Sequence, residues 1–396
     1  MLNLEEAQER LLTLVKPGPI EWLDTEAALG FYLAEDAKAR RTQPPADLSA
    51  MDGYAICGEG PWQRVGESRA GEPFDGYLEH GQCTRISTGA HMPQGSDRVL
   101  IQENAAISGE TIASAEGEEL PPPDRHVRKR GFDFAEGDTV LSAGTRLGPA
   151  PLALAISAGH GTLPVHKAPN IAILDSGDEL ASDPAACGPD QIPASNGAMI
   201  EAMVRPLGCT PHRLGPVADD LEALAKALAR ANDVEILITT GGASVGDHDL
   251  VQQALRDWGA EIDFWKVAIK PGKPLMVATR DRDWGTQIIL GLPGNPVSSF
   301  VTAFLFALPL IRAAMGDRDP LPKTESRIAS ATLPATGPRQ EFLRGISSDN
   351  EVAPASSQDS SALLALAQAN CLINRPSDSA EAAIGDVVPV YNLRNG

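Results

Sequence analysis

The stretch EILITTGGASVGDHDL, residues 235–250, decides the fold, because it joins a short β-branched run to a glycine turn and the start of a helix. A buried strand that ends in glycines and leads into a helix is typical of parallel α/β sheets. The same alternation continues on both sides of this stretch. The strand-like segments are 171–174, 235–240 and 262–269, and the helix-like segments are 196–207, 221–231, 249–258 and 297–315. We therefore predict a doubly wound α/β domain with a mostly parallel sheet, whose ligands gather at the carboxyl ends of the strands.

The rest of the chain has a different texture. Residues 4–15 carry apolar side chains at helical spacing until Pro17-Gly18-Pro19 ends the pattern. From about Arg41 to Gly137, short apolar runs alternate with Gly, Pro and Asp, which predicts a small β-rich domain inserted into the chain. After Pro320 the helical signal gives way to short strand-like pieces, which predict a separate C-terminal β domain.

Composition excludes several classes of protein. The length of 396 residues predicts about two to three domains at roughly 150 residues each. The net charge of −20 disfavours a binder of nucleic acid or anionic membrane, since both partners are negatively charged. The five cysteines form no C-x-x-C pair, which indicates reduced thiols. The N-terminus lacks the pattern of a secretory signal, and the longest apolar run, 301–311, is shorter than the about 20 residues of a membrane span. We therefore expect a soluble cytoplasmic protein.

Residues 242–246, Gly-Ala-Ser-Val-Gly, also fit the G-x-S-x-G nucleophile turn of serine hydrolases. In that fold the catalytic histidine comes well after the serine, whereas the last histidine of this chain is His248. Chain order therefore argues against a serine hydrolase. Neither a P-loop nor a dinucleotide-binding fingerprint is a better explanation, because Gly272-Lys273 is followed by Pro274 and no G-x-G-x-x-G occurs here.

The same glycine turn suits an anionic ligand. Glycines after a strand let backbone N–H groups approach a phosphate, and the N-terminus of the next helix adds a positive dipole. Asp247 and Asp249 stand at the start of that helix, where either one can simply be its N-cap. A cap explains one aspartate but does not need two.

Further carboxylates stand on similar turns elsewhere. Asp52 stands in the run Ser49 to Tyr54, Asp133 follows Arg130-Gly131-Phe132, and the pair Asp178-Glu179 follows Asp175-Ser176-Gly177. Each one alone is explained by an Asx turn or a helix cap. Together they offer the hard oxygen ligands that Mg²⁺ takes in proteins. No His/Cys cluster with zinc spacing competes with that interpretation.

Three lysines lie close together in one segment of this acidic chain. Lys266, Lys270 and Lys273 lie on and just after the strand-like segment 262–269, and Pro271-Gly272 forces a turn that brings Lys270 and Lys273 near each other. This arrangement predicts an oxyanion site, and solvated surface lysines are the alternative.

A rigid turn, Leu292-Pro293-Gly294-Asn295-Pro296, comes directly before the last helix-like segment. Its backbone can line a pocket with little entropy left to lose. The alternative is a simple connection in which Pro296 takes the first helical position.

These motifs together resemble one family, the molybdopterin molybdenumtransferases, the group that includes the gephyrin E domain. The resemblance covers essentially the whole chain, and its blocks occur in the family's order. The blocks are residues 49–56, 85–93, 177–180, 241–247, 270–274, 292–298, 337–344 and 357–366.

The resemblance implies an elongated homodimer of multidomain α/β plus β protomers. In each protomer residues 1–43 and 139–167 would form a connecting domain, 44–138 an inserted β-rich lid, 168–318 a doubly wound α/β pterin-binding domain, and 319–396 a barrel-like C-terminal β domain. It also implies a reaction in which molybdate is inserted into the dithiolene of adenylylated molybdopterin and AMP is released by hydrolysis, with help from Mg²⁺. The implied protein partners are the molybdopterin adenylyltransferase and recipient molybdoenzymes.

The resemblance also assigns roles to individual residues, with Asp52 and Thr88 as lid residues that face the pocket of the partner subunit. The implied catalytic set is Asp52, Thr88, Glu179, Asp249, Lys270 and Lys273. The implied pterin- or phosphate-binding set is Gly241, Gly242, Ser244, Gly246, Asp247, Pro293, Asn295, Pro296 and Ser298. The implied Mg²⁺ ligands are Asp52, Asp133, Glu179 and Asp249. The dithiolene sulfurs come from the substrate, so the enzyme needs no catalytic cysteine.

Two positions depart from the family's usual pattern. Asp47-Leu48 stands where the family usually has Asp-Asn, and Asp175-Ser176-Gly177 stands where it usually has Ser-Thr-Gly. We expect the extra carboxylate of Asp175 to raise the negative potential beside an anionic substrate.

Two other functions remain open at this point. A non-catalytic scaffold of the same fold would not need the acidic set, yet Asp52, Thr88, Glu179 and Asp249 all stand in their motifs. Adenylylation of molybdopterin by a related α/β domain would not need a lid or a C-terminal domain. We therefore favour the insertion reaction.

Overall fold

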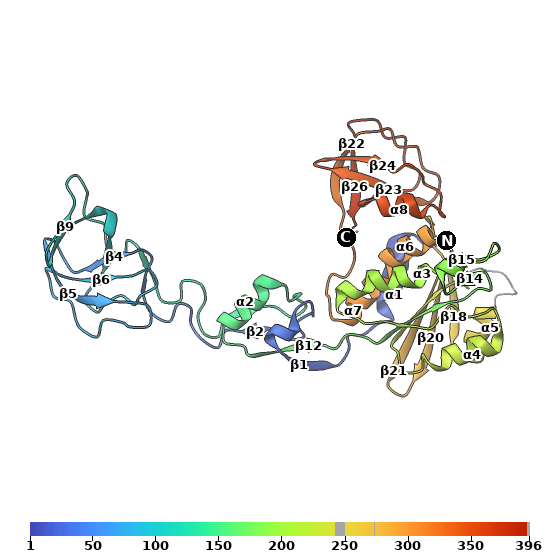
Figure 1. Cartoon of the computed structure of the whole chain (residues 1–396), viewed down its shortest axis with the longest axis horizontal. Coiled ribbons are helices and arrows are strands. Elements are labelled where there is room, and N and C mark those ends of the chain that lie inside the picture. The colour runs from blue at the N-terminus through green and yellow to red at the C-terminus, as the bar shows by residue number, and fades with distance from the viewer. Residues whose placement is uncertain (242–249, 273, 394–396) are drawn as a thin grey trace. The chain divides into compact units, whose positions relative to one another are not determined.

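A computed structural model describes residues 1–241, 250–272 and 274–393 (Figure 1). The described chain divides into two compact units. The large unit comprises residues 1–21, 30–34 and 164–396, and the small unit comprises residues 22–29 and 35–163. Each unit is described separately below.

The large unit contains a six-stranded sheet in the order β16-β13-β17-β21-β20-β18. The strands are β13 (Ile171–Asp175), β16 (His212–Arg213), β17 (Ile236–Thr240), β18 (Glu261–Lys266), β20 (Pro274–Arg282) and β21 (Gly285–Leu292). The first four strands of the order run parallel, whereas β20 is antiparallel to both β21 and β18. Two-residue strands β14 (Leu180–Ala181) and β15 (Ile192–Pro193) form a ladder of their own.

Helices cover both faces of this sheet (Figure 1). Alternate residues of each strand enter different cores: Ile171 and Ile173 pack in one, and Ala172 and Leu174 in the other. The first core is shared with α1 (Leu4–Thr13), α3 (Asn196–Val204), α6 (Pro296–Thr302) and α7 (Leu308–Ala314). The second core is shared with α4 (Leu221–Ala229) and α5 (Leu250–Asp257). This two-residue period confirms the predicted doubly wound layer.

The last helix differs from the single helix expected over 297–315. A π-helical turn, Ala303–Ala307, separates α6 from α7. Pro309 has no N–H to bond the carbonyl of Leu305, so the regular ladder cannot continue there. The side chain of Gln8 donates to that carbonyl at 2.8 Å. Residues Pro296–Ala314 are long and apolar enough to cross a membrane, but 83% of that segment is buried inside the protein, as expected of a core helix.

The strand expected over 262–269 is also divided, into β18 and the short β19 (Ile269–Lys270). Between them, Val267 bridges to Leu2, and Ala268 donates to the carbonyl of Leu2 at 2.8 Å. This pairing with the N-terminus redirects the chain, so that β19 joins a different sheet.

That second sheet builds the C-terminal β domain, in the order β19-β23-β24-β22-β26-β25. Its further strands are β22 (Glu325–Ala329), β23 (Gln340–Ser348), β24 (Glu351–Pro354), β25 (Cys371–Arg375) and β26 (Val387–Asn392), with helix α8 (Leu363–Gln368) between β24 and β25. An additional pairing of β23 with β25 closes the sheet on itself. The predicted barrel-like C-terminal domain is confirmed.

The small unit is β-rich, as predicted. Its main sheet has the order β7-β4-β6-β5-β9-β8. The strands are β4 (Gly53–Ile56), β5 (Trp62–Ser68), β6 (Gln82–Ile86), β7 (Arg98–Ile101), β8 (Ala105–Ser108) and β9 (Thr111–Ser114). Further two-stranded ladders of this unit join β2 (Ala37–Lys38) to β11 (Thr139–Leu141), and β3 (Leu48–Ser49) to β10 (Val127–Arg128). The paired strands β1 (Ile20–Asp24) and β12 (Thr162–His166) each have residues in both units. Helix α2 (Pro149–Ser157) packs against the 3₁₀ turn η1 (Thr25–Ala28).

Candidate functional site

The carboxyl ends of β13, β17 and β21 form the edge at which the sequence predicted a ligand. The chain leaves β13 toward β16 on one side and later returns to β17 on the other, so the strand order reverses between β13 and β17. Open α/β sheets bind their ligands at such a switch point. Gly241 lies there with a φ of 121°, which favours glycine, and donates to the carbonyl of Leu292 at 3.1 Å. Several predicted site residues lie outside the described part of the chain: Gly242, Ser244, Gly246, Asp247, Asp249 and Lys273.

Asp175 ends β13 at this edge, and its surroundings differ from the expectation. Its side chain is only 1% exposed and accepts hydrogen bonds from the Thr240 hydroxyl and, at 3.2 Å, from the Arg213 guanidinium. A Cβ atom at Gly197 would overlap the Asp175 carboxylate, so the glycine leaves room for this group. The charge of Asp175 is therefore compensated within the fold instead of facing a ligand.

Asp178 and Glu179, on the turn after β13, differ in their roles. The carboxylate of Asp178 accepts from the backbone N–H of Asp219 at 3.0 Å, as expected of a turn residue. Glu179 is exposed, and its carboxylate lies where a Cβ atom at Gly177 would stand. Because Asp178 is engaged as a turn residue and Glu179 is exposed, Glu179 remains the candidate ligand of the pair.

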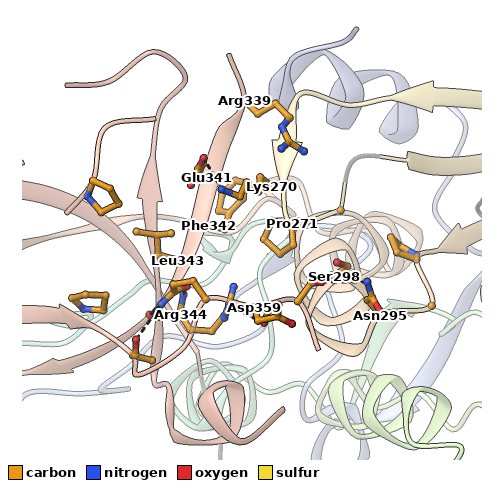
Figure 2. Close-up of a pocket in the computed structure, with 18 residues that line it drawn as sticks. Lys270, Pro271, Asn295, Ser298, Arg339, Glu341, Phe342, Leu343, Arg344 and Asp359 are labelled. Atoms are coloured by element: carbon orange, nitrogen blue, oxygen red, sulfur yellow. Dashed lines mark hydrogen bonds and ion pairs between the residues drawn. The ribbon is translucent and has the colours of Figure 1, made fainter. Parts of the chain in front are cut away.

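A cavity of about 800 Å³ lies between the α/β layer and the C-terminal β domain of the large unit (Figure 2). Four of the predicted site residues line it: Lys270, Pro293, Asn295 and Ser298. Pro296 is instead the first residue of α6, as the alternative interpretation had it. Asn196 is the first residue of α3, and its amide donates to the carbonyl of Gly294 at 2.7 Å. This bond fixes the turn that carries Asn295.

The opposite wall of the cavity was not assigned from the sequence. Arg339, Glu341, Arg344, Gln358, Asp359 and Ser360 contribute to it. Strand β23 and the residue before it carry Arg339, Glu341 and Arg344. From sequence alone, charged side chains on a strand are expected to face solvent. Their place in the cavity depends on the pairing of β23 with β19, which lies about 70 residues earlier in the chain.

Hydrogen bonds hold this wall against the α/β layer. The guanidinium of Arg344 is 1% exposed and donates to the carbonyls of Ser357 and Asp359 at 3.2 and 3.0 Å. Burial lowers the pKa of Arg344 from its usual value. Ser360 accepts from the Asn295 amide at 3.2 Å, and its carbonyl accepts from the N–H of Val297 at 3.1 Å. This wall of the cavity is therefore held in place by hydrogen bonds.

In the small unit, the structure brings two of the predicted residues together. The backbone N–H and the hydroxyl of Thr88 donate to Oδ1 of Asp52 at 2.7 and 3.2 Å. These bonds lower the pKa of Asp52 from its usual value, and the backbone bond has the larger effect. Asp52 is exposed and ionised at neutral pH, so its other oxygen can take a cation.

The predicted metal ligands are divided between the units. Asp52 and Asp133 belong to the small unit and Glu179 to the large unit. Asp133 is exposed, and its backbone N–H donates to the carbonyl of Gln43 at 3.0 Å. Within the described residues, no group of three or more His, Cys, Asp or Glu side chains stands ready to hold a metal ion. The metal set remains a prediction.

Comparisons with known proteins cover nearly the whole chain. Residues 2–159 match the model of the MoeA N-terminal region (domain I and II), residues 172–313 a probable molybdopterin binding domain, and residues 327–393 the MoeA C-terminal region (domain IV). A molybdopterin molybdenumtransferase of Haemophilus influenzae is 32% identical, with 98% of each chain covered. One of Bacillus subtilis is 31% identical, with 99% of this chain and 94% of the relative covered.

Solved structures agree in fold. The crystal structure of a molybdopterin biosynthesis MoeA protein from Pyrococcus horikoshii has a TM-score of 0.78 at 25% identity, with 99% of each chain covered. The crystal structure of a molybdopterin biosynthesis MoeA protein from Pyrococcus horikoshii OT3 has a TM-score of 0.83 at 23% identity, with 99% of this chain and 100% of that chain covered. Sequence and structure together lead to one conclusion: the chain belongs to the molybdopterin molybdenumtransferase family.

Proposed function

We infer that the chain is an enzyme of molybdenum cofactor biosynthesis that inserts molybdenum into molybdopterin. The observation that carries this inference is the cavity of about 800 Å³, which is lined by the cations Lys270 and Arg339 in a chain with a net charge of −20. Cations that line a cleft of an acidic protein create a local positive potential, which attracts small anions. Molybdate and the phosphate of a pterin substrate are anions of this kind.

The substrate we propose is adenylylated molybdopterin, with molybdate as the second substrate and AMP as the released product. The ammonium of Lys270 and the guanidinium of Arg339 would bind oxyanion oxygens, and Asn295 and Ser298 would orient polar groups of the pterin. Apolar lining groups such as Pro271, Pro293 and Phe342 exclude water from one side of the cavity. Hydrolysis of the pyrophosphate link needs neutralised phosphoryl oxygens and a positioned water.

We propose Mg²⁺ as the cofactor, because the donor chemistry fits this ion. Asp52 and Glu179 are exposed carboxylates, and Asp133 and Asp249 complete the predicted set. All are hard oxygen donors of the type that Mg²⁺ prefers. When bound, the ion would neutralise charge on the phosphoryl oxygens of the substrate. Asp52, already oriented by Thr88, would hold its free oxygen ready as a ligand.

A homodimer is proposed with the same reaction, since the residues assigned to one site lie in both units of the protomer. Large apolar side chains support it: Trp22, Leu29 and Ile156 of the small unit are 58%, 56% and 51% exposed. Trp22 lies in β1, Leu29 directly follows η1, and Ile156 lies in α2, which packs on η1. Exposed apolar groups of this size are typical of a surface that another chain covers. Light scattering on the wild-type chain and on Trp22→Ser would test this assembly.

The function is tested by following AMP release from adenylylated molybdopterin by the purified protein with Mg²⁺, with and without molybdate. We expect molybdate-dependent AMP release together with molybdenum bound to the dithiolene product. Chelation of Mg²⁺ should abolish the release, and added Mg²⁺ should restore it. Tight binding of the pterin without turnover would instead indicate a scaffold, and formation of adenylylated product from ATP would indicate the adenylylation reaction.

A further inference from the structure

Glu341 places a negative charge in the cavity beside the cation Lys270, and Asp359 is the other acidic residue that lines it. Strand β19 pairs in parallel with β23, so that Lys270 and Glu341 are neighbours in register, and Gln340 donates to the carbonyl of Ala268 at 2.8 Å. This pairing directs both side chains into the cavity, where Figure 2 shows them pointing toward each other. Nζ of Lys270 lies 3.1 Å from Oε1 of Glu341.

The two partners are unequally accessible. The side chain of Glu341 is 14% exposed, whereas that of Lys270 is 52% exposed. A ligand in the cavity therefore reaches the ammonium of Lys270 more easily than it reaches the carboxylate. The carboxylate is held in place by a strand in the middle of a closed sheet, so it cannot withdraw far when a ligand arrives.

Another cation near Glu341 is already engaged. Arg375 stands directly opposite Glu341 in the antiparallel pairing of β23 with β25. Its guanidinium donates to the carbonyls of Pro334 and Ala380. Lys270 is thus the ion-pair partner of Glu341, and any anion that binds Lys270 must compete with this carboxylate.

We propose that Glu341 sets the oxyanion affinity of the cavity by competing with the bound anion for Lys270. This inference rests on the proposed function. Glu341 would be a positioning residue, because it acts on the bound anion through Lys270. A bound oxyanion loses part of the attraction of Lys270 and gains the repulsion of Glu341. The affinity of the cavity for oxyanions is therefore lower than the cations alone would give. Weaker binding suits a site that must release its oxyanion to a second substrate.

Charge repulsion has a signature that a structural role lacks. The interaction energy of Glu341 with a bound anion scales with the anion's charge. Molybdate and perrhenate are tetrahedral oxyanions of similar size with charges of −2 and −1. Removal of the Glu341 charge should therefore raise the logarithm of the affinity for molybdate about twice as much as that for perrhenate.

The test is equilibrium dialysis of the full chain against each anion, with molybdenum and rhenium counted by mass spectrometry. We expect Glu341→Gln to bind molybdate about fivefold and perrhenate about twofold more tightly than wild type, a modest gain because the pair is partly exposed. Glu325→Gln is the matched control, because Glu325 is paired with Arg327 at 2.6 Å in the same β domain and does not line the cavity. It should leave both affinities unchanged.

The outcomes separate this inference from the proposed function. Unchanged or weaker molybdate binding by a folded Glu341→Gln protein overturns the inference, as does an equal gain for both anions. Glu341→Asp, which keeps the charge but retracts it from Lys270, should give a smaller gain and serves if the glutamine variant does not fold. If wild type and Lys270→Met bind molybdate equally, the cavity is not the oxyanion site and the proposed function itself fails there.

Discussion

Three carboxylates, Asp52 in the small unit and Asp175 and Glu341 in the large unit, are bonded in opposite ways. In the small unit, Asp52 accepts its hydrogen bonds from neutral donors, the backbone N–H and the hydroxyl of Thr88, and keeps its negative charge. In the large unit, Asp175 and Glu341 are each bonded to a cation, Arg213 and Lys270. A carboxylate oriented by neutral groups remains available to an incoming cation, whereas a paired one shapes the fold or tunes its partner. The partners of an acidic residue, more than its position in a motif, therefore decide its role.

The largest effect that this comparison predicts follows from Asp52→Asn. The amide keeps an oxygen for the Thr88 bonds but loses the charge that would bind a metal ion. We expect molybdate-dependent AMP release to fall at least about 100-fold, because a metal ligand is lost. The melting temperature should stay near that of wild type, since the side chain is exposed.

Asp75→Asn is the matched control for this variant, because Asp75 is another exposed aspartate of the small unit. It should turn over at the wild-type rate. Near-normal activity of a folded and dimeric Asp52→Asn protein would show that the reaction does not need a carboxylate without a cationic partner at this position. The different bonding of Asp52 and of Asp175 and Glu341 would then have no bearing on activity.

The next effect concerns a buried cation of the large unit, Arg344. Replacement by Met removes the bonds to the carbonyls of Ser357 and Asp359, which hold the wall of the cavity. Hydrogen bonds to a charged donor are worth about 1.5–3 kcal/mol, so we expect the unfolding free energy of the large unit to fall by about 2 kcal/mol. Hydrogen exchange should speed up in residues 355–361. Unaltered exchange in that segment would show that Gln358 and Ser360 alone fix the wall.

The fold was largely predictable from local pattern. The alternation around residues 235–250 located β13, β17 and the helices between them. Asp220 caps α4, because its carboxylate accepts from the N–H of Ala223 at 2.9 Å. The divided strand at Val267 and the π turn before Pro309 were not predictable. They depend on Leu2 and on Gln8, partners that lie about 265 and 300 residues away in the chain.

The site was predictable on one side only. Turns that contain Gly and Pro identified Lys270, Asn295 and Ser298, because Gly and Pro mark turns with exposed backbone at the ends of strands. Arg339 and Glu341 carry no such punctuation, and charges on a strand are usually solvated. Their role arises only when β23 pairs with β19.

A smaller effect is expected at Asp175, where the sequence and the structure disagree. The sequence suggested an extra negative charge beside the substrate, but the structure pairs that charge with Arg213 and Thr240. Asp175→Ser should therefore destabilise the large unit by about 1–2 kcal/mol through lost buried hydrogen bonds. Molybdate affinity, measured by equilibrium dialysis, should change less than about twofold because the pair is already neutral. A clear gain in anion affinity would restore the interpretation from sequence.

The smallest effect is expected from Thr88→Val, which keeps the backbone N–H bond to Asp52 and removes the weaker hydroxyl bond. The pKa of Asp52 is lowered by both bonds, so the variant raises it toward the usual carboxyl value. The stability that a lowered carboxyl pKa contributes is present at pH values above the pKa of that carboxyl in the unfolded chain. It is lost as the pH falls through the pKa of the carboxyl in the folded protein. If the Thr88 hydroxyl acts only by orienting Asp52, activity at pH 7 should match that of wild type, and at pH 4 it should fall by less than about twofold, because even an ordinary aspartate is about half ionised there. The measurement is the ratio of AMP release at pH 4 and pH 7 for both proteins. A ratio equal to that of wild type would mean that the backbone bond alone keeps Asp52 ionised, and the hydroxyl would then be free to contact substrate.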